Sequence, residues 1–154
     1  MDSAIRFRRA TVNDVPAIVQ LLADDTLGAT REHPEPPLPQ SYYDAFAAID
    51  RDPNIELIVA DSGSEVVGTV QLTYLPGLSR QGMWRALIEA VRVAAPVRGQ
   101  GIGALMIQDT IARARSRGCG LVQLTSDKSR EDAQRFYERL GFKRTHMGMK
   151  LSLQ

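Results

Sequence analysis

The stretch VRVAAPVRGQGIGAL, residues 91–105, joins an apolar strand to a helix through a loop with three glycines in five positions. Glycine has no Cβ, so consecutive amides of such a loop can turn toward one point without a steric clash. Those amides and the positive end of the following helix attract anions, and proteins commonly bind phosphate groups in this way. The stretch therefore predicts a phosphate-binding loop at the start of a helix.

Two common phosphate-binding loops do not fit the spacing. A P-loop needs Gly-Lys followed by Ser or Thr, and this loop contains no such sequence. A dinucleotide-binding loop needs a third glycine where this chain has Ala104 or Met106, and it opens a βαβ unit instead of following a fourth strand. A tight turn without a ligand stays open as the alternative on this loop alone.

The composition indicates one domain, residues 1–154, with no electrostatic signature of a nucleic-acid or membrane partner. Its 19 Lys and Arg residues nearly balance 18 Asp and Glu residues, for a formal net charge of +1. The single cysteine, Cys119, excludes an internal disulfide and a cysteine-based zinc site, and His33 and His146 stand in different segments, so we expect no metal. Without a signal-peptide pattern or a membrane-length apolar run, we expect a cytoplasmic protein.

Apolar periodicity predicts an α+β fold in the order βααβββαβαβ, with a mixed, mostly antiparallel central sheet flanked by helices. The predicted elements are a strand and a helix within 4–25, a helix at 41–52, strands at 55–62, 66–75 and 83–94, a helix at 103–116, a strand at 120–127, a helix at 130–141 and a final strand at 145–154. The final strand is inferred from alternating apolar residues, and the proline-rich residues 28–40 predict a loop.

Residues 91–103 resemble the acetyl-CoA signature of the GNAT superfamily of N-acetyltransferases. Three blocks of this family occur in the expected order, at Arg8, Ala10 and Thr11, at Arg98, Gly101 and Gly103, and at Phe136, Tyr137, Gly141 and Phe142. The resemblance implies a GNAT-like fold and direct transfer of an acetyl group from acetyl-CoA to a primary amine of a small molecule. One departure is Arg130, where many family members carry asparagine.

The resemblance also implies that the main chain holds acetyl-CoA. The backbone around Val91 and Val93 would pair with the pantetheine like an added strand. The pyrophosphate would bind the amides of the glycine loop, contributed by Arg98, Gly99, Gln100, Gly101, Ile102 and Gly103.

Acetyl transfer to an amine needs one group that accepts a proton and one that supplies a proton. The resemblance assigns the second role to Tyr137, whose phenol has a reference pKa of about 10. The alternative is that Tyr137 only completes the apolar stripe of its helix with Phe136 and Leu140. Cys119 is expected to be an apolar filler, because the family transfers the acetyl group directly.

Glu89 is the candidate base. It interrupts an apolar strand, where a carboxylate is costly unless it faces a polar cleft, and it lies nine residues before Arg98, where many GNAT enzymes have a glutamate. The alternative is an ion pair with Arg85, Arg92 or a neighbouring strand. Strand alternation puts Glu89 on the face of Val91 and opposite Arg92, unless a bulge changes the parity.

Three functions stay open: acetylation of a small-molecule amine, acetylation of a protein or peptide, and non-catalytic binding of acyl-CoA by a regulator. Loops 29–40 and 75–82 are expected to frame the acceptor pocket with Arg31, Glu32, His33, Glu35 and Arg80. This mixture of charges favours a zwitterionic amine over a polycation. The partner is thus expected to be a small amine, not nucleic acid or membrane, and the chain could form a homodimer.

Overall fold

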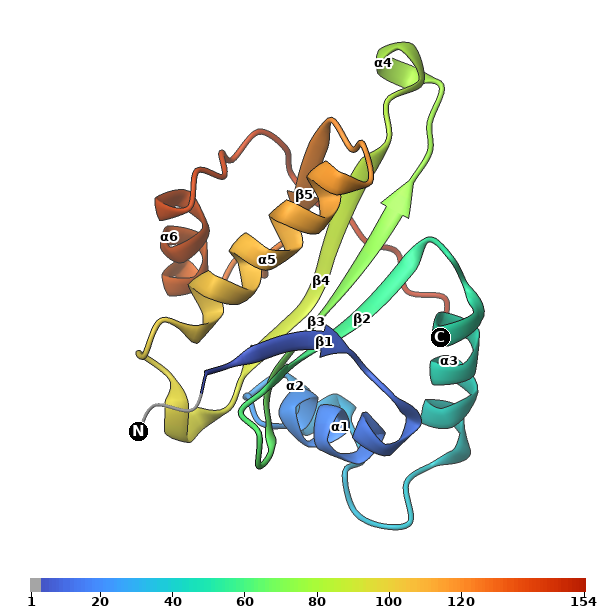
Figure 1. The fold of residues 1–154 in the computed structure, drawn as a ribbon, viewed down its shortest axis with the longest axis vertical. Helices are drawn as coiled ribbons and strands as arrows, with labels where there is room; N and C mark the ends of the chain where they lie inside the picture. The colour runs from blue at the N-terminus through green and yellow to red at the C-terminus, as the bar shows by residue number, and fades with distance from the viewer. Residues whose placement is uncertain (1–3) are drawn as a thin grey trace. The chain divides into compact units, whose positions relative to one another are not determined.

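A computed structural model describes residues 4–154, in which five strands form one sheet in the order β1-β2-β3-β4-β5 (Figure 1). The strands are β1 Arg6–Arg9, β2 Ile55–Asp61, β3 Val66–Leu75, β4 Arg85–Val93 and β5 Leu121–Leu124. The helices are α1 Val15–Ala23, α2 Gly28–Arg31, α3 Gln40–Arg51, α4 Ser79–Gly82, α5 Ile102–Ser116 and α6 Glu131–Arg139, with 3-10 turns at Val12–Asp14 and Ala95–Val97. The predicted α+β class with a central sheet flanked by helices is confirmed.

The chain divides into two compact units. The first ends at Gln123 and holds α1 to α5, strands β1 to β4 and all but the last residue of β5. The second runs from Leu124 to Gln154 and holds α6 and the C-terminal tail.

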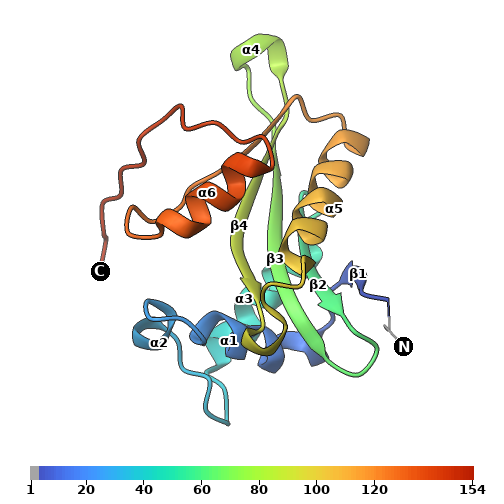
Figure 2. The ribbon, with the colours of Figure 1, turned by 90° about the vertical axis from the view of Figure 1, so that its left-hand side faces the viewer.

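Strands β1 to β4 of the first unit pair antiparallel, and the register assigns their side chains to two faces. Residues that pair directly across strands lie on the same face of a sheet. One face is covered by α5, since a Cβ on Gly68 of β3 would lie 3.5 Å from Sδ of Met106. The other face carries Val59, which packs with Val19 of α1 and Phe46 of α3. Figures 1 and 2 show α5 on the opposite side of the sheet from α1 and α3.

An ion-pair cluster anchors β1 to the turn before α1. Arg8 donates to both carboxylate oxygens of Asp14, at 2.8 and 3.0 Å, and its Nε donates to Asp61 of β2 at 2.9 Å. Asp14 is buried and also accepts the Thr11 amide at 2.7 Å. The hydrogen bonds from Arg8 hold the pKa of Asp14 below its usual value. This cluster gives Arg8 and Thr11, two residues of the N-terminal family block, a structural role.

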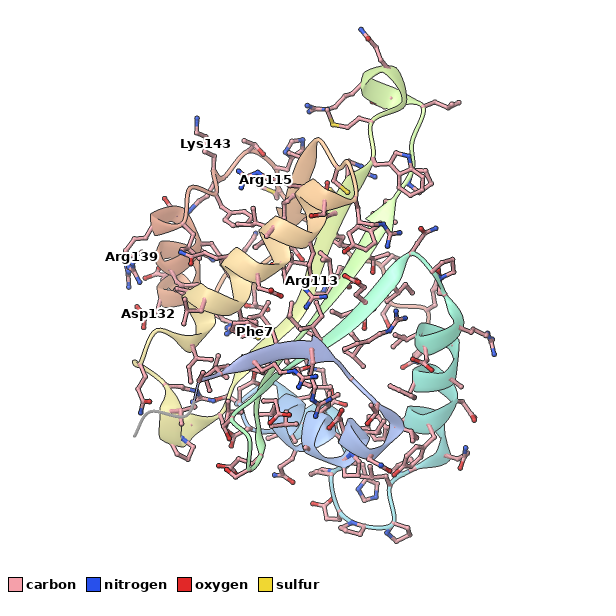
Figure 3. The ribbon with its side chains drawn as sticks, in the orientation of Figure 1. Phe7, Arg113, Arg115, Asp132, Arg139 and Lys143 are labelled. Atoms are coloured by element: carbon pink, nitrogen blue, oxygen red, sulfur yellow. The ribbon has the colours of Figure 1, made fainter. Side chains whose placement is uncertain are left out.

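Helix α5 is tied to its sheet face at the end farthest from the glycine loop. Arg113 donates to the main-chain oxygen of Phe7 in β1 at 3.2 Å, and the two residues are labelled in Figure 3. The guanidinium of Arg117, just after α5, lies 4.0 Å from the centre of the Tyr74 ring. Tyr74 is buried and donates to Glu56 at 2.6 Å, and its burial raises the pKa of its hydroxyl. These contacts fix the helix whose first turn borders the glycine loop.

Residues 28–40, predicted as a loop, begin with a short helix, α2. The prolines of this segment begin only at Pro34, so they do not prevent a helical turn before them. Asp25 accepts the Gly28 amide, and a Cβ on Gly28 would lie 1.8 Å from the Leu22 oxygen. Only glycine fits there, because the helical turn closes tightly on the end of α1.

The predicted final strand, residues 145–154, is wrong for the single chain. These residues form no strand, and among residues 4–154 the main chain of 143–154 makes no main-chain hydrogen bond. A strand needs a neighbour to pair with, and alternation alone does not supply one. The alternating apolar side chains are left exposed, and they are Met147, Met149, Leu151 and Leu153.

Candidate active site

The glycine loop has the left-handed backbone that its sequence predicts. Gly99 has φ of +81° and Gly101, the residue just before α5, has φ of +84°. A Cβ at either position would have no atom within 4 Å, so there is space for a side chain. Glycine is required there because of the left-handed backbone conformation. The predicted strand-loop-helix arrangement is therefore present.

Six consecutive amides of this loop are available to a ligand. Within residues 4–154, the amides of 99–104 donate no hydrogen bond to another protein group. The flanking amides are used, because Arg98 donates to the Ala95 oxygen and Leu105 to the Gly101 oxygen. The Ile102 side chain is buried and anchors the loop while its amide stays free. Free amides at the positive end of a 15-residue helix form an anion site.

The Arg98 side chain fastens the loop to its surroundings. Its Nε donates to the Val93 oxygen at the end of β4 at 3.0 Å, and its Nη2 lies 3.4 Å from Asp24, just after α1. The loop is thus joined to both β4 and α1 in the first unit.

A β-bulge in β4 determines which residues face the same side. Gln71 pairs with Glu89 and Thr69 pairs with Arg92. A step of two residues along β3 therefore corresponds to a step of three residues along β4. The extra residue is accommodated at Ala90, which has φ of +53°. Glu89 and Arg92 therefore share a face.

Because of this bulge, the prediction of which β4 side chains share a face is wrong. Glu89 was expected on the face of Val91 and Val93 and opposite Arg92. The pairing of Val93 with Gly68 instead puts Val93 on the α5 face, while Glu89 and Arg92 lie on the face that α1 and α3 cover.

Glu89 is exposed on its face, and the ion pairs considered from the sequence are not formed. Among residues 4–154, no cation lies within ion-pair distance of Glu89. Arg92 instead lies 3.0 Å from Asp25, and Arg85 donates to the side chain of Gln123 at 2.9 Å. The carboxylate is thus accessible on a strand that is otherwise largely apolar.

Within residues 4–154, no strand pairs with the second half of β4 on the side of β5, although the main-chain oxygens of Val91 and Val93 accept hydrogen bonds from the side chains of Arg92 and Arg98. Strand β5 begins beside the start of β4, where the Gly120 amide donates to the Trp84 oxygen at 2.9 Å. β5 has four residues and β4 has nine, so β5 cannot accompany Val91 and Val93. An extended ligand can pair with the exposed edge of a strand.

Tyr137 belongs to the second unit, where it lies on α6 in an aromatic cluster. Its ring meets Phe136 at 5.1 Å and Phe142 at 5.7 Å between centroids, both edge-to-face. Its main-chain oxygen accepts the amides of Leu140 and Phe142, and Gly141 with φ of +100° ends the helix. The apolar stripe predicted for this helix is present, and the proton-donor role of Tyr137 stays a prediction.

The acidic residues Glu32 and Glu35 of loop 29–40 already have partners nearby in the chain. Glu32 accepts the Tyr42 hydroxyl at 2.9 Å, and His33 lies 2.7 Å from Glu35 and holds the pKa of Glu35 below its usual value. The other predicted pocket loop, with Arg80 in α4, lies at the opposite end of the sheet from α2 (Figures 1 and 2). The expectation that both loops frame one acceptor pocket is therefore wrong.

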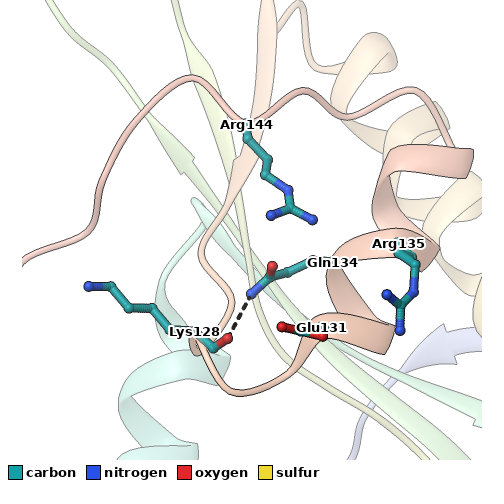
Figure 4. Close-up of a pocket in the computed structure, with 5 residues that line it drawn as sticks. All are labelled: Lys128, Glu131, Gln134, Arg135 and Arg144. Atoms are coloured by element: carbon teal, nitrogen blue, oxygen red, sulfur yellow. Dashed lines mark hydrogen bonds between the residues drawn. The ribbon is translucent and has the colours of Figure 1, made fainter.

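The second unit has an open hollow of about 450 Å³ that the sequence analysis did not identify (Figure 4). Its lining consists of Lys128, Glu131, Gln134, Arg135 and Arg144. Small-molecule sites are mostly apolar with a few polar groups, and this lining is almost entirely polar. The hollow is therefore not our candidate for the acceptor site.

The remaining candidates for chemistry are few. Burial raises the pKa of the Cys119 thiol, which keeps it protonated and poorly nucleophilic at neutral pH.

Within residues 4–154, no cluster of three or more His, Cys, Asp or Glu side chains could hold a metal ion. In the same range, no helix is long and apolar enough to cross a membrane.

Comparison with known proteins identifies relatives of this chain. Residues 16–142 match the model of the acetyltransferase (GNAT) family. An aminoalkylphosphonate N-acetyltransferase of Salmonella typhimurium is 36% identical over 107 residues, which cover 70% of this chain and 69% of that protein. A glucosamine 6-phosphate N-acetyltransferase of Trypanosoma brucei brucei is 38% identical over 88 residues, which cover 57% of this chain and 58% of that protein.

The fold is also that of a solved relative. The crystal structure of a transcriptional regulator from Bacillus halodurans C-125 matches with a TM-score of 0.95 and 52% identity, over 97% of this chain and 100% of that one. The family model spans most of the sequence and includes the glycine loop, β4 and α6. The chain therefore belongs to the acetyltransferase (GNAT) family and is an acetyl-CoA-dependent N-acetyltransferase.

Proposed function

We propose that this enzyme acetylates the primary amine of a small molecule that also carries an anionic group. The observation that carries the proposal is the combination on β4 and its following loop of an exposed carboxylate, Glu89, with six free amides. The names of the two relatives support the acceptor class, because aminoalkylphosphonate and glucosamine 6-phosphate each combine an amine with a phosphonate or phosphate. We expect the whole chain, residues 1–154, to act as one acetyltransferase domain in the cytoplasm.

The main chain of this protein would hold acetyl-CoA, the acetyl donor. Acetyl-CoA, when bound, supplies an acetyl group activated as a thioester. The free amides from Gly99 onward fit its pyrophosphate, and the open β4 edge at Val91 and Val93 fits its pantetheine. The full predicted set of donor-binding residues is Val91, Val93, Arg98, Gly99, Gln100, Gly101, Ile102 and Gly103.

Glu89 would act as the general base. A primary alkylammonium has a pKa near that of lysine, about 10.4, so it must lose a proton before its nitrogen can attack. Glu89 is exposed and has no ion-pair partner among residues 4–154, which makes it available to take that proton through a water molecule.

Tyr137 would act as the general acid. Its phenol, with a reference pKa of about 10, can supply the proton that a leaving thiolate needs. The family resemblance supports this role, and the edge-to-face contacts with Phe136 and Phe142 would keep the ring in one orientation.

Arg85 would bind the anionic group of the acceptor. It lies on the same face as Glu89, because Leu75 and Gln71 of β3 are their respective partners. Four residues of strand separate the two by about 13 Å along β4. Among residues 4–154 no carboxylate pairs with Arg85, which donates instead to the neutral side chain of Gln123. A long guanidinium side chain on that face suits a phosphonate, phosphate or carboxylate.

A second candidate function is the non-catalytic regulator. It is favoured by the name of the Bacillus halodurans relative, a transcriptional regulator that is 52% identical to this chain. Such a protein would bind acetyl-CoA at the same loop without using Glu89 or Tyr137. Acetylation of a protein or peptide, the other reading from the sequence, has no comparable support among the relatives described above.

One assay separates these functions. Acetyl-CoA is mixed with an aminoalkylphosphonate, a glucosamine phosphate, a simple alkylamine and a lysine-containing peptide, and release of free thiol is followed. We expect turnover of the anionic amines, and Arg85→Gln should raise their KM while leaving the alkylamine unaffected. Arg80→Gln, which removes an exposed arginine from α4, is the control. Turnover of the peptide alone would reject the proposed acceptor class.

A further inference from the structure

The sheet face that carries Glu89 becomes accessible part-way along β3. Residues two apart along a strand lie on the same face. Val67 and Thr69 of this face are buried, with only 3% and 1% of their surfaces exposed, whereas Gln71 and Thr73, which follow on the same face, are half-buried. The helical cover of this face therefore ends near Gln71.

The polar side chains at this point of β3 have no partner in the described chain. The hydroxyl of the buried Thr69 donates to the Ile58 oxygen at 3.1 Å. By contrast, the side chains of Gln71 and Thr73 make no hydrogen bond to any of residues 4–154. Polar groups that are partly withdrawn from water normally bond to protein or to ordered water. A polar ligand on this face could take the place of that water.

Gln71 lies directly opposite Glu89. The two residues pair across β3 and β4, and residues paired in this way have Cβ atoms about 4.5–5.5 Å apart. This separation would allow the carboxamide to donate to the carboxylate. Within residues 4–154, however, neither side chain bonds to the other or to a third group. Both side chains are therefore available to one ligand on the same face.

We propose that Gln71 binds the amine of the acceptor and orients it for attack. This inference rests on the proposed function, because it takes Glu89 as the base. A primary ammonium has three N–H donors, and Glu89, acting through water, would engage one of them. The carboxamide oxygen of Gln71 would accept another N–H and keep it after deprotonation, because an amide oxygen does not remove the proton. The nitrogen lone pair would then be held in one orientation.

The order of residue pairs on this face suits an acceptor with two polar ends. Arg85 lies on the same face as Glu89, with the pair of Thr73 and Leu87 between them. The ammonium would lie between Gln71 and Glu89, and the anionic group would lie at Arg85. The main chain separates these two ends by about 13 Å, a distance that the long side chains can shorten.

The test is calorimetric titration of the full-length protein, saturated with coenzyme A so that no turnover occurs. The two ligands are an aminoalkylphosphonate and the alkylphosphonate without the amine. Gln71→Met removes the carboxamide at nearly constant length, and Gln71→Glu keeps an acceptor oxygen. Gln20→Met is the control, because Gln20 is exposed on α1 and its side chain makes no hydrogen bond among residues 4–154. An unchanged affinity for coenzyme A shows that each variant is folded.

We expect Gln71→Met to raise the dissociation constant of the aminoalkylphosphonate about 10- to 100-fold, because a hydrogen bond to a charged group is lost. The dissociation constant of the alkylphosphonate should change by less than about threefold, because it has no N–H group. Gln71→Glu and Gln20→Met should bind the aminoalkylphosphonate at least about as tightly as wild type. An unchanged affinity in Gln71→Met, equal losses for both ligands, or a loss in Gln71→Glu as large as in Gln71→Met would each overturn the proposal.

Release of free thiol from acetyl-CoA, followed in parallel, separates this inference from the proposed activity. If wild type binds the aminoalkylphosphonate but releases no thiol, the proposed function is wrong and the titrations still decide the role of Gln71. If thiol is released and Gln71→Met has an unchanged KM, only the role of Gln71 is wrong. A wild-type protein that does not bind the aminoalkylphosphonate would overturn both.

Discussion

Arg92 of β4 and Asp25, between α1 and α2, form an ion pair with 3.0 Å between Nε and Oδ2. The Nε group is buried, and its N–H does not reach hydrogen-bond geometry, so the contact is electrostatic. The other oxygen of Asp25 accepts the Gly28 amide at the start of α2. Without the bulge at Ala90, Arg92 would face α5 instead. The bulge therefore places Arg92 on the face of Glu89 and joins the donor-binding strand to the α1–α2 segment.

Loss of this pair should destabilise the enzyme. The side chains of Arg92 and Asp25 are only 17% and 27% exposed, so Asp25→Asn leaves a mostly buried guanidinium without its counter-charge. We expect a loss of about 2 kcal/mol in the free energy of unfolding. Urea denaturation measures it.

The neighbouring residue provides a matched control for that experiment. Asp24 pairs with Arg98 at 3.4 Å, but these side chains are 44% and 52% exposed. Asp24→Asn should cost less than about 1 kcal/mol, because exposed ion pairs contribute little. Equal effects of the two substitutions would mean that burial of the Arg92–Asp25 pair is unimportant.

The Arg8–Asp14 pair should make stability depend on pH in the acid range. Because the folded chain lowers the pKa of Asp14, its contribution is complete above the ordinary aspartate value of about 3.9 and is lost as pH falls through the lower, folded value. Asp14→Asn should therefore cost about 2 kcal/mol at pH 7 and progressively less below pH 4. Denaturation at several pH values tests this.

The control for Asp14 is an exposed aspartate. Asp50 lies 3.9 Å from Arg9, and both side chains are about half exposed. Asp50→Asn should leave the pH dependence of stability unchanged. If the gap between wild type and Asp14→Asn were constant from pH 3 to pH 7, the assignment of a lowered pKa to Asp14 would be wrong.

Gly101→Ala should weaken coenzyme A binding beyond its cost in stability. The substitution forces a Cβ into a left-handed backbone, so the loop should change conformation and its amides should lose their common direction. Gly63→Ala is the control, because Gly63 has φ of +96° in the β2–β3 turn and also has no atom within 4 Å of a built Cβ. Both variants should lose about 1 kcal/mol of stability.

Calorimetric titration with coenzyme A then distinguishes the effects of the two substitutions on binding. The dissociation constant should rise at least about tenfold for Gly101→Ala and stay unchanged for Gly63→Ala. Equal affinity of both variants would show that the conformation of the glycine loop does not matter for binding.

Tyr137→Phe tests the general acid. The substitution keeps the ring contacts with Phe136 and Phe142 and removes only the hydroxyl. We expect kcat to fall by about 10- to 1,000-fold with little change in coenzyme A affinity. Steady-state kinetics and calorimetry measure the two quantities. An unchanged kcat would leave Tyr137 with a packing role alone.

Much of the first unit was predictable because its signals are local. The ranges of β3 and α3 match their predictions closely, since alternating or helical periodicity there agrees with burial. The glycine loop was predictable for a related reason, because Gly99 and Gly101 mark backbone conformations that other residues avoid.

The failures concern contacts that local sequence does not encode. The bulge at Ala90 depends on the register with β3, and alternation in β4 alone could not locate it. The two loops expected around the acceptor are separated by the length of the sheet, which follows from topology and not from composition. The tail has a strand's alternation, but whether a strand forms depends on a partner that the sequence does not specify.

The most direct test of the proposed activity compares two amines of equal length, an aminoalkylphosphonate and the alkylamine without the phosphonate. Free thiol released from acetyl-CoA gives kcat/KM for each, with wild type and with Glu89→Gln. We expect acetylation of both, at least about a tenfold preference for the phosphonate, and a loss of about 100-fold in Glu89→Gln. Binding of coenzyme A with no thiol release from either amine would contradict the account and favour the regulator.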